Sequence, residues 1–304
     1  MRAAFGETLL RLGDQYHNLV VLTADVAKPT NVYAFSQRHP DRFFNVGISE
    51  QDMVGIAAGF SLSGNIPVIA AFAPFLMRAW EQIRSTIARV SLNVKIVGTH
   101  AGLSASEEGS SHQSLEDVAL MRVLPHMTVV VPGDKQEIRE ATEALIEMSG
   151  PTYLRLGRDE DLRFLEGDRV FQLGKAAILR DGSDMTVISN GGMTPEVLKA
   201  VEQAKVSARV LHMPTVKPLD QDAVLSAARD TGHIVCVEEH SIIGGLGGAV
   251  AELVADKCPV LVKRLGVNDD FGESGPRDEL MRKHGLEAAA IARELAAIKG
   301  GNVP

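Results

Sequence analysis

The sequence is poor in the residues that mark disulfide-stapled and aromatic-rich folds. Of its 304 residues only two are cysteine, and aromatic residues make up 5%, with a single tryptophan. Cys236 lies in an apolar run at 234–237, so we expect it to fill the core, and nothing in the composition indicates an oxidising compartment. A core that depends on Val, Ile, Leu and Ala favours a parallel α/β architecture over an all-β sandwich.

Basic residues are also in deficit. Lysine and arginine number 31 against 39 acidic residues, which gives a formal net charge of −8. Nucleic acids and anionic membranes both require a basic face on their partner, so the composition argues against either. A phosphorylated substrate is compatible with this charge, because a few local arginines and histidines suffice to bind one phosphate.

The sequence has no unbroken hydrophobic run of membrane-spanning length. Residues 53–77 carry no charge, but polar residues, a glycine and two prolines divide them into a helix, a turn and a strand. Residues 1–7 are typical of a helix start and not of a signal peptide, because no apolar segment with a cleavage site follows. We therefore expect a cytoplasmic protein.

The hydrophobic pattern alternates between strand and helix periods, which predicts two successive α/β units with mostly parallel sheets. In the first unit, residues 1–165, we expect strands at 19–24, 66–72, 94–99, 128–131 and 152–156, and helices at 49–63, 78–92, 115–121 and 134–148. Residues 166–183 have little period and are predicted to be a linker. In the second unit, residues 184–304, we expect strands at 185–189, 209–213, 233–238 and 260–265, with helices between them and at the C-terminal end.

A carboxylate stands at the start of one expected helix. Ser49 and Asp52 form a capping-box pattern, and Glu50 falls in the first turn, where free N–H groups and the helix dipole favour an ionised side chain. Glu50 either carries a function or simply occupies a helix start, as acidic residues often do. Because the residues at positions 55 and 57–59 are glycine or alanine, this helix has almost no bulky side chains. Such a helix is typical of a close contact with another helix or backbone.

Phe72 ends the strand expected at 66–72, and Phe75 follows it. These two residues either line a slot for a flat ring or pack in the core. The polar loop at 100–114 lies beyond the carboxyl end of the next strand, where open α/β sheets bind ligands. Its two histidines, His100 and His112, are too far apart in sequence for a typical metal pair, so no metal site is predicted.

Two further features have plain structural interpretations. Arg155 and Arg158 lie at the end of the last strand of the first unit. If the strand stays regular, alternation places them on opposite faces, so at most one should point into a site. The glycine run at 244–248 resembles a dinucleotide fingerprint, but Val250 stands where the third glycine is required. Close packing of a helix on a strand explains these glycines better.

Taken together, four stretches resemble the pyrimidine-binding and C-terminal domains of the transketolase family. They are residues 45–53, 72–78, 99–113 and 271–275, and the resemblance extends over nearly the whole chain. It implies a thiamine-diphosphate pyrimidine-binding domain followed by a transketolase C-terminal domain. The implied cofactor contacts are Asp25, Glu50, Phe72, Phe75 and Arg78, and the implied substrate contacts are Thr30, His100, Glu108, His112 and Arg158.

The resemblance also implies roles for these residues. Glu50 would hydrogen-bond a ring nitrogen of the aminopyrimidine, and the two phenylalanines would pack on that ring. His112 would assist proton transfers on the sugar, which is typically worth 10² to 10⁴ in rate. His100 and Arg158 would hold the substrate phosphate. Of the remaining contacts, Asp25 would lie near the cofactor and Thr30 near the phosphate.

Two positions depart from the pattern of transketolase proper. Arg78 stands where a tyrosine is familiar, although the deoxyxylulose-phosphate synthase relatives carry arginine there. Glu108 replaces an aspartate that typically binds a sugar hydroxyl, and its longer side chain suits an unusual ketose.

One motif of the family is missing. No Gly-Asp-Gly sequence occurs in the chain, although the family uses that motif with a downstream asparagine to bind the diphosphate and its Mg²⁺. The resemblance therefore implies a separate partner chain that supplies the diphosphate half of the site, in an α2β2 assembly.

Three functions are compatible with these residues. The leading one is ketol transfer from a ketose phosphate, such as xylulose 5-phosphate or apulose 4-phosphate, to an aldose. The second is decarboxylation of a 2-oxoacid, as in deoxyxylulose-phosphate synthase or the β subunit of a 2-oxoacid dehydrogenase. The third is a non-catalytic binding or regulatory role, which intact Glu50, His100 and His112 disfavour.

Overall fold

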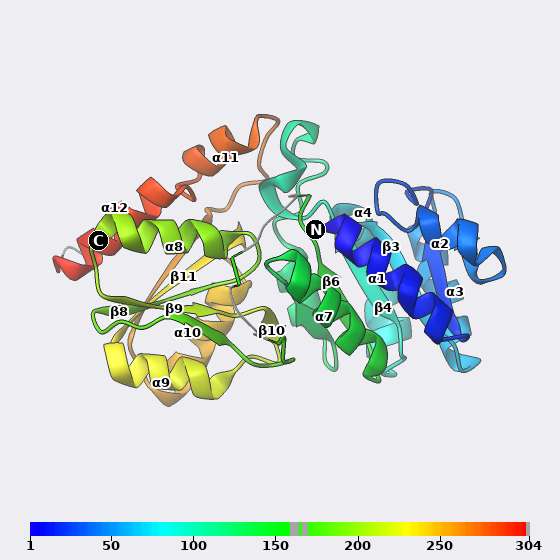
Figure 1. The fold of residues 1–304 in the computed structure, drawn as a ribbon, viewed down its shortest axis with the longest axis horizontal. Helices are drawn as coiled ribbons and strands as arrows, with labels where there is room; N and C mark the ends of the chain where they lie inside the picture. Colours follow the sequence, from blue (N-terminus) through cyan, green and yellow to red (C-terminus); the bar gives the residue numbers. More distant parts are fainter. Residues whose placement is uncertain (159–163, 166–169, 302–304) are drawn as a thin grey trace.

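Strands and helices alternate along the chain, as predicted, and the strands form two sheets. The structure, a computed structural model, describes residues 1–158, 164–165 and 170–301. Figure 1 shows the two sheets in separate lobes, with the start of the chain at the junction between them. The predicted fold class, two successive α/β domains with mostly parallel sheets, is confirmed.

The first sheet has seven strands in the order β10-β5-β6-β4-β3-β1-β2. Its members are β1 (Leu19–Thr23), β2 (Phe43–Asn45), β3 (Ile66–Phe72), β4 (Lys95–Thr99), β5 (Thr128–Val130), β6 (Thr152–Arg155) and β10 (Thr215–Lys217). All neighbours pair in parallel except β10, which comes from the second half of the chain and lies antiparallel to β5. Because helices cover both faces of the sheet, the strands are buried on both sides, and their sequences are short apolar runs.

Helical segments form a layer on each face of this sheet. They are α1 (Arg2–Gln15), α2 (Tyr33–Arg38), η1 (Pro40–Arg42), α3 (Glu50–Leu62), α4 (Ala73–Met77), α5 (Trp80–Gln82), η2 (Ile83–Ala88), η3 (Gly102–Glu108), α6 (Asp117–Arg122) and α7 (Lys135–Glu147). One hydrophobic cluster joins α1 and α7 to the sheet, and Figure 1 shows these two helices side by side. A second cluster joins α3 and η2 to the opposite face.

Three local predictions for the first unit were wrong. The helix expected at 78–92 begins only at Trp80 and is divided into α5 and the π-helical η2, and a separate short helix, α4, lies before it, directly after β3. Ser49 is the N-cap residue of α3, but its side chain makes no capping hydrogen bond, so the capping box does not form. The polar loop at 100–114 contains a 3₁₀-helical segment, η3.

The second sheet has five strands in the order β12-β11-β8-β9-β7. They are β7 (Ala177–Arg180), β8 (Met185–Ser189), β9 (Ala208–His212), β11 (His233–Ser241) and β12 (Leu261–Val267), with helices α8 (Met193–Ala204), α9 (Gln221–Thr231), α10 (Leu246–Lys257), α11 (Arg277–Lys283) and α12 (Ala288–Lys299). The prediction of a linker at 166–183 did not anticipate β7, which pairs antiparallel with β9 at the edge of this sheet. Residues 166–169 of that segment lie outside the described residues.

The glycine run at 244–248 packs closely, as predicted. A Cβ at Gly247 would press against Arg264 and Cys236 on the neighbouring strands. The buried Glu238 carboxylate accepts hydrogen bonds from the backbone N–H groups of Leu246 and Gly247, at 2.7 and 2.8 Å. These glycines therefore let the start of α10 approach β11 and β12, and a carboxylate of the protein occupies the helix N-terminus.

Buried polar contacts hold the two lobes together. His212, at the end of β9, lies 2.8 Å from the Glu137 carboxylate of α7, and its other ring nitrogen lies 2.7 Å from the Thr194 hydroxyl. On the surface, Arg122 forms a bidentate ion pair with Glu252 of α10. Together with the insertion of β10 into the first sheet, these contacts fix the second domain against the carboxyl edge of the first.

A buried charged cluster lies under that edge. The Asp117 carboxylate accepts from the Tyr153 hydroxyl at 2.6 Å and from Arg155 Nε at 2.9 Å. Burial lowers the pKa of the Arg155 guanidinium, but Asp117, Tyr153 and Glu239 together raise it by more, so Arg155 stays charged. Burial, reinforced by Asp117, raises the pKa of Tyr153, so its hydroxyl remains a donor.

Gly98→Ala tests how tightly this cluster is packed. A Cβ at Gly98, in β4, would overlap the hydroxyl of the fully buried Tyr153. We expect the substitution to lower the free energy of unfolding by about 1–3 kcal/mol, the usual cost of overpacking a core. Denaturant unfolding measures the difference.

The matched control is Gly55→Ala, on the exposed face of α3, where a Cβ would meet nothing within 4 Å. It should leave the free energy of unfolding unchanged or raise it by up to about 1 kcal/mol, since alanine is the better helix former. Equal effects of the two substitutions would refute the tight packing at Gly98.

Candidate functional site

The predicted site residues gather at one edge of the first sheet. Asp25 follows β1, Phe72 ends β3, His100 follows β4 and Arg158 comes shortly after β6. These strands are parallel and lie in the order β6-β4-β3-β1-β2, so their carboxyl ends share one edge. Glu50 begins α3, the helix that follows β2. This is the edge at which open α/β sheets bind ligands.

Four aromatic rings form the centre of the site. Phe72 and Phe75 stack with ring centroids 5.0 Å apart and an interplanar angle of 22°. The His100 ring lies against Phe72, with centroids 3.7 Å apart. His112 presents its ring edge-on to Phe75 at 5.3 Å and to Phe72 at 6.0 Å. The structure thus brings together residues from β3, α4 and both ends of the predicted loop.

His100 is locked by a chain of hydrogen bonds. Its Nε2 lies 3.0 Å from Nη1 of Arg2, and its Nδ1 lies 2.9 Å from the Thr99 hydroxyl. Because a guanidinium has no acceptor, Nε2 must accept and the ring proton must sit on Nδ1, which donates to Thr99. The Thr99 hydroxyl in turn donates to the Ala71 carbonyl at 3.4 Å. His100 is therefore a neutral imidazole of fixed tautomer.

The electrostatics agree with that assignment. Burial, helped by the nearby charges of Arg2 and Arg158, lowers the pKa of His100 to about 3. His100 is only 2% exposed and adopts a positive φ of 56°, so the backbone holds it in place as well. Protonation would place a buried cation beside two arginines, which is unfavourable.

The arginines next to His100 give this end of the site a positive charge. Arg2, at the start of α1, also donates to the Pro29 carbonyl at 2.8 Å. Arg158 is half-exposed and pairs with Glu108 at 3.3 Å. Since an exposed pair is worth at most about 1 kcal/mol, a substrate anion can compete with Glu108 for Arg158.

Glu50 lies at a different part of the same edge. It is the first residue of α3, only 4% exposed, and its carboxylate makes no hydrogen bond within the described part of the chain. The helix N-terminus favours an ionised carboxylate there. Arg78 lies nearby: its carbonyl accepts from the side chain of Gln51, the next residue of α3, at 3.3 Å, while the Arg78 side chain is exposed.

Two predicted residues lie outside these groups. Asp25 is exposed and has a positive φ of 61°, and its backbone N–H donates to the Asn45 side chain of β2 at 2.9 Å. Thr30 is buried, and its hydroxyl donates to the Val26 carbonyl at 2.6 Å within its own loop. The Thr30 side chain therefore has no free proton for a substrate in this conformation.

No sequence motif pointed to the roles of two other residues at this edge. Arg2 meets His100 across 98 positions of the chain, and no local pattern links them. Arg155 was considered only together with Arg158. The strand ends at Arg155, so alternation does not apply to the pair: Arg155 is buried against Asp117, whereas Arg158 lies beyond β6 and pairs with Glu108.

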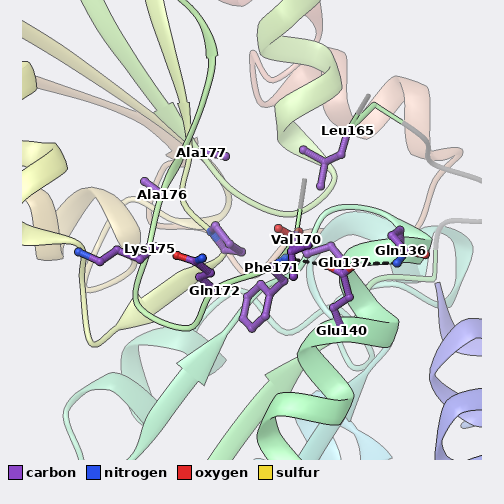
Figure 2. A pocket seen from close by; sticks show the side chains of 11 residues that line it. Gln136, Glu137, Glu140, Leu165, Val170, Phe171, Gln172, Lys175, Ala176 and Ala177 are labelled. Atoms are coloured by element: carbon purple, nitrogen blue, oxygen red, sulfur yellow. Dashed lines mark hydrogen bonds between the residues drawn. The ribbon is translucent and has the colours of Figure 1, made fainter. Parts of the chain in front are cut away.

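A separate hollow lies between α7 and the segment that leads into the second sheet. Figure 2 shows Phe171, Gln172 and Lys175 along one side and Glu137 and Glu140 of α7 along the other. The backbone N–H of Phe171 donates to the Glu140 carboxylate at 2.6 Å. This hollow contains none of the predicted site residues.

The described residues contain neither a metal cluster nor a membrane-spanning helix. Within residues 1–158, 164–165 and 170–301, no three His, Cys, Asp or Glu side chains gather as they would around a metal ion. Over the same ranges, no helix combines the length and the apolar character needed to cross a membrane.

Two family models match the chain. The model described as "Transketolase, pyrimidine binding domain" matches residues 1–161, and "Transketolase, C-terminal domain" matches residues 174–291. A "Putative transketolase C-terminal section" of Methanocaldococcus jannaschii is 43% identical, over 97% of this chain and 95% of that protein. The "6-deoxy-6-sulfo-D-fructose transketolase subunit SqwH" of Clostridium sp. is 40% identical, over 96% and 92%.

More distant relatives and a solved structure extend the comparison. One subunit of an apulose-4-phosphate transketolase of Phocaeicola vulgatus is 36% identical, over 96% of this chain and 95% of that protein. A 1-deoxy-D-xylulose-5-phosphate synthase of Geobacter sulfurreducens is 35% identical over 99% of this chain, which spans 48% of that longer protein. A solved "Split gene transketolase, inactive beta4 tetramer" is 42% identical, with a TM-score of 0.88 over 98% of both chains.

The low pKa of His100 predicts acid sensitivity. The folded state binds a proton at His100 only near pH 3, whereas the unfolded chain does so near the ordinary value of 6.5. Above pH 6.5 the residue is neutral in both states, and as the pH falls from 6.5 towards 3 it lowers the free energy of unfolding. His100→Gln should therefore lose less stability over that range than the wild type in denaturant unfolding at stepwise pH.

Charge variants of Arg2 supply the control. Arg2→Met should raise the pKa of His100, and Arg2→Lys, which keeps the charge, should raise it less, as read from the ring signals of labelled histidine by NMR. A His100 ring that titrates near 6.5 in the wild-type protein would contradict the assignment.

Proposed function

Because the chain belongs to the transketolase family, we propose that it is the subunit of a two-chain transketolase that binds the pyrimidine half of thiamine diphosphate. The observation that carries this proposal is the carboxylate of Glu50, a residue only 4% exposed, which has no hydrogen-bond partner within the described residues. A carboxylate only accepts hydrogen bonds, and this one lies with free acceptor capacity at the edge where open α/β sheets bind ligands, so we expect it to accept from a ligand donor in the working enzyme.

The surrounding residues suit an aminopyrimidine. Glu50 would accept a hydrogen bond from the protonated ring nitrogen, and the stacked Phe72 and Phe75 offer a flat apolar surface for the ring. Asp25 and Arg78 would complete the cofactor side at its exposed rim. The bound cofactor would supply the electron sink for making and breaking carbon–carbon bonds, and the protein residues would orient it.

The half-buried His112 would handle protons on the substrate. Its ring stands edge-on to both phenylalanines, and its Nδ1 lies 2.9 Å from the Ser111 hydroxyl. The other ring nitrogen, Nε2, would then exchange a proton with a sugar hydroxyl. Glu108, on the same loop, would accept a hydrogen bond from another hydroxyl of the ketose.

The positive end of the site suits an anionic group on the substrate. Arg2 and Arg158 would supply the charge, and Thr30, next to the carbonyl that Arg2 binds, would line the loop beside it. Both ring nitrogens of His100 are already engaged, so His100 would act in anion binding by orienting Arg2. A guanidinium binds phosphate or sulfonate oxygens in a bidentate fashion.

A second chain would complete the active site. The sequence lacks the Gly-Asp-Gly motif for diphosphate and Mg²⁺, and the chain spans about half of the synthase relative. The outer face of α3 supports such a contact, because Gly55 and Gly59 have open space around them. Ile48, two residues before the helix, and Leu62, its last residue, are 83% and 76% exposed. We propose an α2β2 assembly in which this face lies against the partner chain.

The substrate is proposed to be a ketose with a terminal anionic group. Xylulose 5-phosphate is the simplest candidate. The names of two relatives, subunits of an apulose-4-phosphate and a sulfofructose transketolase, support a modified ketose as the alternative. The resemblance to deoxyxylulose-phosphate synthases supports decarboxylation of a 2-oxoacid as the second candidate function.

Reconstitution with the chain that carries the missing motif tests the function. We expect the complex, with thiamine diphosphate and Mg²⁺, to transfer a two-carbon unit from a ketose phosphate to an aldose without releasing carbon dioxide. Glu50→Gln should lower kcat by at least about 10²-fold, because the buried acceptor for the ring nitrogen is weakened. Coupled product assays and cofactor titration measure both effects.

Two controls accompany this test. Glu202→Gln removes an exposed carboxylate of α8, away from the site and from the outer face of α3, and should leave kcat unchanged. The isolated chain should not bind thiamine diphosphate at micromolar concentration. Tight binding without the partner, full activity of Glu50→Gln, or turnover of pyruvate alone would each refute a stated part of the proposal.

Substitution of the arginines tests the anion site. Arg2→Met and Arg158→Met should each raise KM for the ketose phosphate by about 10- to 100-fold, since a hydrogen bond to a charged group is worth about 1.5–3 kcal/mol. Turnover of the corresponding unphosphorylated ketose should not change. Steady-state kinetics on both substrates separates the effects.

Arg11→Met, which removes an exposed arginine paired with Glu143, is the control and should leave both KM values unchanged. A loss that is equal for phosphorylated and unphosphorylated substrates would assign the two arginines to packing instead of anion binding.

A further inference from the structure

The loop that carries Glu108 and His112 belongs to the first domain by sequence but is held by the second. Leu103 and Leu115, near its two ends, are fully buried in the hydrophobic cluster of the second domain, together with Val267 and Leu280. The backbone N–H of Ser241, at the end of β11, donates to the Leu115 carbonyl at 2.7 Å. Figure 1 shows this loop beside α11.

Gln113, the residue after His112, makes the most direct link. It is 3% exposed, and its side-chain Nε2 donates to the Ser106 carbonyl at 3.0 Å and to the Glu273 carbonyl at 2.8 Å. One amide group therefore joins the two halves of the loop and ties them to the segment at 271–275 of the second domain. Gln113 is not in the catalytic set implied by the family resemblance.

Two glycines allow the loop and the segment to approach each other. Gly109 and Gly272 have positive φ angles of 76° and 77°. A Cβ at Gly109 would overlap the Ser274 hydroxyl, and one at Gly272 would overlap the Gln113 side chain. Each glycine thus faces a residue of the other domain, and both are required for backbone conformation as well as space.

The contacts lie where the loop is strained. Ser106 has φ 51° and ψ −113°, a conformation that L-residues adopt at a cost of about 1–3 kcal/mol and keep only when neighbours enforce it. Gln113 binds the carbonyl of that residue. Without the amide donor, the strained turn and the Glu273 carbonyl both lose a buried hydrogen bond.

We propose that Gln113, clamped by Gly272 and Glu273, is a positioning residue through which the second domain sets the height of His112 above Phe72 and Phe75. This inference rests on the proposed function, because it concerns the group that would move protons on the sugar. A shift of the loop by about 1 Å would misplace His112 while leaving the Glu50 side of the site intact. Misplacement on that scale costs about 10²-fold in rate.

The test uses Gln113→Met in the reconstituted two-chain enzyme. Methionine keeps the length of the side chain but cannot donate to either carbonyl. We expect kcat for ketol transfer to fall by about 10- to 100-fold, while KM for the ketose phosphate and the affinity for thiamine diphosphate change by less than about threefold. A purely structural role would lower the amount of active enzyme without this split between kcat and KM.

Gly272→Ala disrupts the contact with Gln113 by a change in the second domain, and it should give the same kinetic pattern. Gly275→Ala is the matched control, because a Cβ there would make only ordinary contact with Leu280, at 3.4 Å. It should leave kcat unchanged. Equal kinetics for Gln113→Met, Gly272→Ala and the wild type would overturn the inference.

Hydrogen exchange gives a readout that does not depend on the reaction. Amides of residues 102–115 should exchange at least about tenfold faster in Gln113→Met and in Gly272→Ala than in the wild type or in Gly275→Ala. If the wild-type complex performs no ketol transfer, the proposed function fails, and this exchange pattern still decides whether the second domain holds the loop. Unchanged exchange in both variants would refute that contact.

Discussion

The buried guanidinium of Arg155 links the first sheet, the loop at 100–114 and the second domain. It ends β6 in the first sheet, is charge-paired with Asp117, and donates from Nη2 to the carbonyls of Ser114 and Glu239. One of these carbonyls belongs to the site loop and the other to the second domain. Removing a partner from a buried charge lowers the stability of the fold strongly. These three contacts therefore fix the positions of the sheet, the loop and the second domain relative to one another.

Around that constraint the site divides into two parts with different physical demands. The side proposed for the cofactor is apolar, with stacked phenylalanines and a Glu50 carboxylate that has no hydrogen-bond partner among the described residues. The side proposed for the substrate is polar and preorganised, with a neutral His100 fixed between Arg2 and Thr99. The residues of this half-site are held by the fold of the chain itself. Under the proposed function, catalysis would still require the second chain.

Local signals predicted the regular elements well and the irregular ones poorly. The strand at 66–72 was predicted to the residue, because a buried parallel strand must be a short apolar run bounded by turns. The helix expected at 78–92 is instead divided into α5 and the π-helical η2, and a further short helix, α4, begins directly after Phe72. Strand β10 is three residues long and pairs with a sheet in the other domain, which no local pattern records.

By itself, the sequence determined the two α/β units and the parallel sheets, together with the family, because hydrophobic period and short motifs are properties of neighbouring residues. It also placed Glu50 at a helix start and His100 after a strand. Only the tertiary structure joined Arg2 to His100, buried Arg155 against Asp117, and tied Gln113 to Glu273 across 160 positions. Such contacts join residues that are far apart in the sequence, and they form only when the chain folds and the two domains pack together. Local sequence patterns, which cover neighbouring residues, therefore cannot predict them.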